Sequence, residues 1–246
     1  MSAITKLTMS ETRLFFREPI GVFFTVLFPP VLLGILGAVP SFREPDKGLG
    51  GLRVIDLYIP IAIAMAVALF SLSGLPQLLA TYREKGILRR LKVTPARPVT
   101  MLGAQLLMCT ALSVVTMLLI VAVGRIAFNV ALPDQIPAYL VAYLLSAVSM
   151  LAIGLLVASL APTAKGAGAI GTLLFFPIIF FAGLWAPREV MPELLRKISD
   201  FTPLGAGVQS LQDAATGSWP QLLHIAVLLG WTVVAGGLAA RYFRWE

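Results

Sequence analysis

The chain alternates between long uncharged apolar runs and short polar breaks. Six runs lack Asp, Glu, Lys and Arg, and each approaches the roughly 20 residues that an α-helix needs to cross a bilayer core. The pattern predicts an all-α integral membrane protein with one transmembrane domain over residues 1–246. The expected spans cover about residues 20–40, 57–80, 99–124, 137–160, 167–186 and 221–240.

An amphipathic stretch, residues 4–18, precedes the first run. It is expected to form a helix with apolar side chains on one face and basic and hydroxyl side chains on another, namely Ile4, Leu7, Leu14 and Phe15 against Lys6, Ser10, Arg13 and Arg17. Such a helix lies in the membrane interface rather than across the bilayer. Because no short basic segment leads into an apolar core with a cleavage site, we expect no cleaved signal peptide.

Composition and charge placement sharpen this picture. Of the 246 residues, 58% are hydrophobic and only 13% are charged, and the mean hydropathy is +0.90, which leaves no room for a soluble catalytic domain. If both termini face the cytoplasm, the inner segments hold 12 of the 19 basic residues, and six of these fall within residues 83–97. Short basic loops face the cytoplasm, so we expect a multi-pass cell-membrane protein with both termini inside.

Several kinds of chemistry are absent from the sequence. No phosphate-binding G-x-x-x-x-G-K-[ST] motif occurs, so we expect that the chain does not itself hydrolyse ATP. His224 is the one histidine and no carboxylates stand at ligand spacing, so no metal site is expected. The lone Cys109 lies in an apolar run and is expected to be a packing residue.

Two apparent motifs have simpler explanations. The glycines of residues 166–171 match a dinucleotide-binding pattern. Glu189 follows near the sequence spacing expected of a carboxylate that binds the ribose, but a predicted span precedes the glycines and another follows them. Small residues that let helices pack closely explain them better. An intramembrane protease is also disfavoured, because the candidate turn at residues 71–74 lacks its first glycine.

The loop between the second and third spans is the most informative segment. Around residues 83–94 an apolar stripe of Ile87, Leu88 and Leu91 is surrounded by Lys and Arg, and Pro95 and Pro98 follow. This pattern predicts a short amphipathic cytoplasmic helix. The alternative is a basic loop that binds anionic lipid headgroups and sets topology.

The same loop carries a family resemblance. Glu84-x-Gly86-x-Leu88-Arg89-Arg90-Leu91-x-x-Thr94-Pro95 resembles the loop of type-2 ATP-binding cassette exporter permeases, particularly the daunorubicin-resistance kind. The segment from Phe175 through Met191-Pro192 resembles that family's fifth span and short outer helices, and Thr202-Pro203-Leu204 resembles the segment that follows. Ala182 stands where many relatives have a polar residue, which leaves the cargo open.

The resemblance implies a function and a set of partners. It implies an exporter subunit for a drug, lipid or other hydrophobic or amphipathic cargo, paired with a second permease copy or paralogue and with a cytoplasmic ATPase dimer that binds ATP and Mg. The loop would couple to the ATPase through Glu84, Gly86, Leu88, Arg89, Arg90 and Leu91. The expected cargo-pathway residues are Phe175, Phe176, Pro177, Phe180, Phe181, Gly183 and Trp185. The competing hypothesis is a membrane structural or assembly protein that uses the basic loop for lipid or partner contact.

Overall fold

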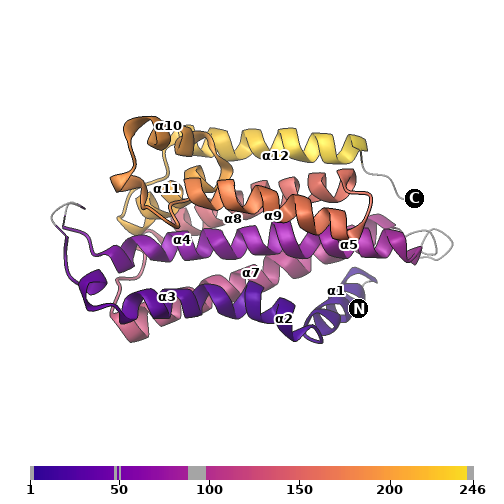
Figure 1. Ribbon diagram of the computed structural model, residues 1–246, viewed down its shortest axis with the longest axis horizontal. Coiled ribbons are helices and arrows are strands. Elements are labelled where there is room, and N and C mark those ends of the chain that lie inside the picture. Colours follow the sequence, from indigo (N-terminus) through magenta and orange to yellow (C-terminus); the bar gives the residue numbers. More distant parts are fainter. Residues whose placement is uncertain (1–2, 47–48, 50, 88–97, 243–246) are drawn as a thin grey trace.

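The computed structural model describes residues 3–46, 49, 51–87 and 98–242 and shows a helical bundle (Figure 1). Six of its helices are long and apolar enough to cross a membrane: Pro19–Ala38, Val54–Glu84, Thr100–Phe128, Ile136–Leu160, Ala164–Phe181 and Leu222–Tyr242. No β-strand occurs in this described part, where an isolated bridge joins Pro45 and Arg53. The prediction of an all-α integral membrane protein with six spans is confirmed.

The first two spans are each built from three consecutive helical segments. The remaining spans are single α-helices. In chain order the segments are α2 (Pro19–Val22), η1 (Phe23–Leu27) and α3 (Phe28–Ala38), then α4 (Val54–Ala68), η4 (Leu69–Gly74) and α5 (Leu75–Glu84), then α7 (Pro98–Phe128), α8 (Ile136–Leu160), α9 (Ala164–Phe181) and α12 (Leu222–Tyr242).

Shorter helices lie at the two ends of the bundle. The amphipathic α1 (Ala3–Phe15) lies at the end that also holds the end of α5 and the end of α12 (Figure 1). We call this the N-terminal end of the bundle. The opposite end holds the other short elements: η2 (Pro40–Arg43), η5 (Arg188–Val190), α10 (Glu193–Phe201) and α11 (Pro203–Ala215).

Proline explains the irregular segment inside the second span. The segment η4 is a π-helix, and at its end the Leu75 N–H bonds to the Phe70 carbonyl five residues back. Pro76 follows and has no N–H to donate to the preceding turn. The second span therefore contains a π-helical turn, a feature frequent at functional sites.

Two glycines let the neighbouring helices reach the η4 backbone. A Cβ atom on Gly154 of α8 would collide with the Ser71 carbonyl, and one on Gly171 of α9 would collide with the Leu72 carbonyl. Backbones can approach this closely only where a side chain is missing. This contact supports the packing interpretation of the glycines in residues 166–171 over a nucleotide-binding one.

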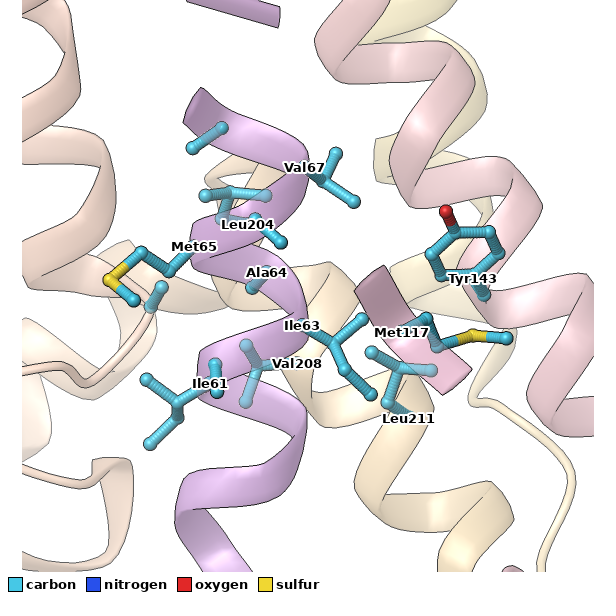
Figure 2. Close-up of a cluster of buried hydrophobic side chains, with 14 of the residues drawn as sticks. Ile61, Ile63, Ala64, Met65, Val67, Met117, Tyr143, Leu204, Val208 and Leu211 are labelled. Carbon is cyan, nitrogen blue, oxygen red and sulfur yellow. The ribbon is translucent and has the colours of Figure 1, made fainter. Parts of the chain in front are cut away.

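The core lies where α4 meets α11 (Figure 2). Leu204, Val208 and Leu211 of α11 are at most 3% exposed and face the buried side chains of α4, with Met117 of α7 and Tyr143 of α8 nearby. Between helices that span a membrane, close van der Waals contact of such side chains stabilises the packing. The sequence predicted short helices here, but it did not predict that α11 enters the core.

The fifth span is shorter than its apolar run. Residues 167–186 are apolar, but α9 ends at Phe181 and Gly183 adopts a positive φ of 97°. The Tyr58 hydroxyl donates to the Leu184 carbonyl at 3.0 Å, which holds the following turn against α4. The expected helix over residues 182–186 is therefore wrong, because hydropathy does not register the left-handed turn that Gly183 permits.

Candidate coupling site

Three consecutive residues at the end of α5 connect this helix to four of its neighbours. Tyr82, Arg83 and Glu84 each make a side-chain hydrogen bond to a different part of the bundle. We call these three residues the α5 joint. They immediately precede the loop that the sequence predicts to be the coupling segment.

Arg83 binds the end of α8. Its guanidinium donates to the carbonyls of Ala158, at 3.4 Å, and Ala161. The last carbonyls of a helix have no partner within the helix and carry partial negative charge. A cation at this position therefore satisfies free acceptors and complements the helix dipole.

Glu84 binds the beginning of the next helix. A carboxylate oxygen of Glu84 accepts a hydrogen bond from the backbone N–H of Ala164, the first residue of α9, at 3.1 Å. The N-terminus of a helix is positive, so the carboxylate is favourable there. The positive Arg83 thus contacts the negative C-terminal end of α8, and the negative Glu84 contacts the positive N-terminal end of α9. These two helix ends meet at residues 161–164.

Tyr82 reaches in the opposite direction, towards α1 and α7. Its hydroxyl donates to Oε2 of Glu11 at 2.6 Å. This carboxylate oxygen also accepts a hydrogen bond from the Gln105 side-chain amide. Glu11 is only 5% exposed and Gln105 is completely buried. A buried carboxylate is costly unless hydrogen bonds satisfy it, so these two donors fix the position of α1 against the bundle.

The described part of the predicted coupling segment ends just beyond the joint. Gly86 has a positive φ of 64°, a conformation that glycine adopts without strain. Glu84 remains exposed despite its bond to α9. The predicted positions Leu88, Arg89, Arg90 and Leu91 lie outside the described residues, as does most of the expected helix over 83–94.

The sequence pattern identifies Glu84 but not the other residues of the α5 joint. It does not single out Tyr82, Arg83 or Glu11. One signal was available, because Glu11 stands four residues after Leu7 and so falls on the apolar face of the amphipathic helix. A carboxylate on such a face requires a buried partner.

The predicted cargo-pathway residues lie on α9 and the turn after it. Phe176 and Trp185 are 54% and 55% exposed, their rings are 6.3 Å apart, and Phe180 lies at the same distance from Trp185. Phe175 is half-buried against the core and Pro177 is exposed. The aromatic group therefore faces outward from the described chain, and its role in a pathway stays a prediction.

Two comparisons with known proteins bear on the identity of the chain. A family model described as "ABC-2 family transporter protein" matches residues 43–241. The chain is also similar to a Bacillus subtilis (strain 168) protein named "Putative transport permease YvfS", with 23% identity over 232 residues that cover 91% of both chains.

Proposed function

Because the chain belongs to the ABC-2 family of transporter proteins, we propose that it is the membrane subunit of an ATP-driven exporter whose ATPase is a separate chain. The family and the six spans make it a transmembrane transporter subunit. Export of a hydrophobic or amphipathic cargo, the cytoplasmic orientation of the N-terminal end of the bundle and the ATPase partner are our additions to that statement.

The α5 joint is the observation that supports this proposal most strongly. A force applied to the loop after Gly86 acts on α5, and the joint ties α5 to α1, α7, α8 and α9. Closure of an ATPase pair on ATP would then tilt several spans together. Packed helices shift as rigid bodies between discrete arrangements, and the ATPase must contact the two arrangements differently to drive the change.

The surface of α9 supports assembly with a second permease subunit. Only 17% of the 18 residues of α9 are buried within one chain, against 83% of an apolar 18-residue stretch in the span that contains α4 and α5. The exposed Phe176 and Trp185 lie on this surface. We propose that a second copy or a related permease faces α9, and that the cargo passes beside it.

The coupling proposal is tested by substitution of Glu84 in the assembled transporter. Glu84→Gln keeps an acceptor for the Ala164 N–H but removes the charge, so insertion and subunit assembly are expected to persist. We expect ATP hydrolysis to continue while vesicle transport falls about 10-fold, equivalent to about 1.4 kcal/mol of lost coupling. Glu193→Gln, an exposed carboxylate paired with Lys197 at the opposite end, is the matched control.

Two results would contradict the proposal. Transport by Glu84→Gln at the wild-type ratio to ATP hydrolysis would remove Glu84 from coupling. Full insertion of wild-type protein with no ATP-dependent transport of any tested drug or lipid would favour a structural or assembly role.

A further inference from the structure

A cavity of about 420 Å³ opens at the end of the bundle opposite the α5 joint. Its walls come from α4, α7, α8, η5 and α11 and from the loop at residues 129–133. Pockets that bind small molecules have volumes of about 300–1,000 Å³ and mostly apolar walls with a few polar groups. The apolar wall here includes Leu57, Ile59, Pro60, Val121 and Val130.

The charged groups that line the cavity do not balance. Three carboxylates line it, from Asp56, Glu189 and Asp213, together with one guanidinium, from Arg53. Arg53 binds both oxygens of Asp56, at 2.9 and 2.7 Å, and also donates to the Phe128 carbonyl. The bond to Asp56 raises the pKa of Arg53, which keeps the guanidinium charged. Asp56 is therefore neutralised within the chain.

Among the described residues, no basic side chain forms an ion pair with Glu189 or Asp213. One carboxylate oxygen of each, Oε2 of Glu189 and Oδ2 of Asp213, is buried without a hydrogen bond. Arg188, which adjoins Glu189 in the sequence, is bound to Asp200 through two hydrogen bonds of 2.9 and 2.8 Å. Both residues are half-buried, but a buried carboxylate oxygen without a donor is unfavourable, so a bound cation would stabilise this cavity.

The form of the cavity favours an organic cation over a metal ion. In the described ranges, no three His, Cys, Asp or Glu side chains come together in a group that could hold a metal. The cavity is also much larger than a metal ion, and more of its exposed lining is apolar than polar. A cation with an apolar body would use both parts of the wall.

We propose that this cavity binds a small amphipathic organic cation, with Glu189 and Asp213 facing its charge and the wall of Leu57, Pro60 and Val130 facing its apolar body. The two carboxylates come from separate elements, η5 and α11. The site is therefore assembled by the fold. The proposal concerns binding by this chain and does not depend on the identity of an ATPase.

Two organic ions of similar size and opposite charge test the site. Full-length protein in nanodiscs is titrated separately with tetraphenylphosphonium and tetraphenylborate, and binding is measured by calorimetry. We expect the phosphonium to bind at least about 10-fold more tightly than the borate, because only the cation complements the two carboxylates. The double variant Glu189→Gln/Asp213→Asn is expected to lose that preference, whereas Glu193→Gln keeps it.

A stability measurement separates binding from folding. Glu189 and Asp213 are half-buried and have no basic partner among the described residues. Removal of their charges relieves an electrostatic cost, so the melting temperature of the double variant is expected to equal or exceed that of the wild type. Ala131→Phe keeps both carboxylates but narrows the cavity from its lining, and it is expected to weaken phosphonium binding. Equal binding of both ions by the wild type, or unchanged phosphonium binding by the double variant, would overturn the proposal.

A lipid amine headgroup has the same chemistry as a free organic cation, so the titration is run in two membranes. In phosphatidylglycerol nanodiscs the cavity is free of amine headgroups. Weaker phosphonium binding after phosphatidylethanolamine is added would assign the cavity to the headgroup, and unchanged binding would assign it to a free cation. Either result supports the cationic ligand.

Discussion

At the scale of single residues, Glu11 has the most constrained surroundings on α1. Its carboxylate accepts hydrogen bonds from the Tyr82 hydroxyl and the Gln105 amide. These two residues lie 71 and 94 positions from Glu11 in the sequence. A hydrogen bond to a charged group contributes about 1.5–3 kcal/mol to stability. The position of α1 therefore depends on a few polar contacts.

Removal of one hydroxyl tests this dependence. Tyr82→Phe leaves Glu11 with one donor, so we expect about 1.5–3 kcal/mol of destabilisation, measured as a lower melting temperature in detergent. Tyr242→Phe, an exposed tyrosine at the end of α12, is the control and should shift little. Equal melting temperatures for the two variants would show that the Glu11 contact contributes nothing.

The sequence indicated some of these residues and concealed others. Glu84 and Gly86 could be singled out because the loop pattern carries them, and the positive φ of Gly86 accords with a turn. The bond between Glu84 and Ala164 joins residues 80 apart. Such a contact depends on how the spans pack against one another, and the local sequence pattern does not predict that packing.

At the scale of elements, the π-helical segment η4 is held between two glycines. Gly154 and Gly171 bring α8 and α9 against consecutive carbonyls of this segment. This arrangement lies in the same span as the α5 joint, so a displacement of α5 and a change in the π-helical turn are expected to be linked.

One methyl group tests the contact. Gly171→Ala places a Cβ against the Leu72 carbonyl, and we expect overpacking to cost about 1–3 kcal/mol. Gly230→Ala on α12 meets nothing within 4 Å, and it should be neutral or stabilising by about 0.5–1 kcal/mol. The comparison is made by thermal unfolding. A Gly171→Ala variant as stable as Gly230→Ala would refute the close approach.

Element boundaries followed from the sequence better than element environments did. Apolar runs located all six spans because lipid demands an uninterrupted stretch of apolar helix. The π-helical turn of η4 was not predicted. It depends on which backbone carbonyl each N–H binds near Pro76, and hydropathy does not indicate this. Nor was the burial of α11, whose alternating glycines, alanines and apolar residues pack into a core that only the folded bundle creates.

At the scale of the whole molecule, the two ends of the bundle differ in chemistry. The N-terminal end holds the α5 joint, whereas the opposite end holds a cavity with two carboxylates that have no basic partner among the described residues. This polarity fits a transporter that receives force at one membrane face and contacts ligand at the other.

Impermeant maleimide labelling tests the orientation. In a Cys109→Ser background, Glu44→Cys at the far end is expected to react in intact cells, and Lys85→Cys is expected to react only after permeabilisation. Both native residues are exposed, so accessibility to the reagent depends on the membrane side. The reverse labelling pattern would invert the proposed topology.

The most direct test of the central claim is the amount of ATPase that co-purifies with the chain. We would compare the wild type with a variant whose residues 88–95 are replaced by a Gly-Ser segment of equal length, which leaves the α5 joint intact. A P-loop ATPase without spans of its own, identified by mass spectrometry, should accompany the wild type and be lost from the variant. Retention of that ATPase at equal amounts would contradict coupling through this loop, and its absence from both would contradict the ATPase partnership.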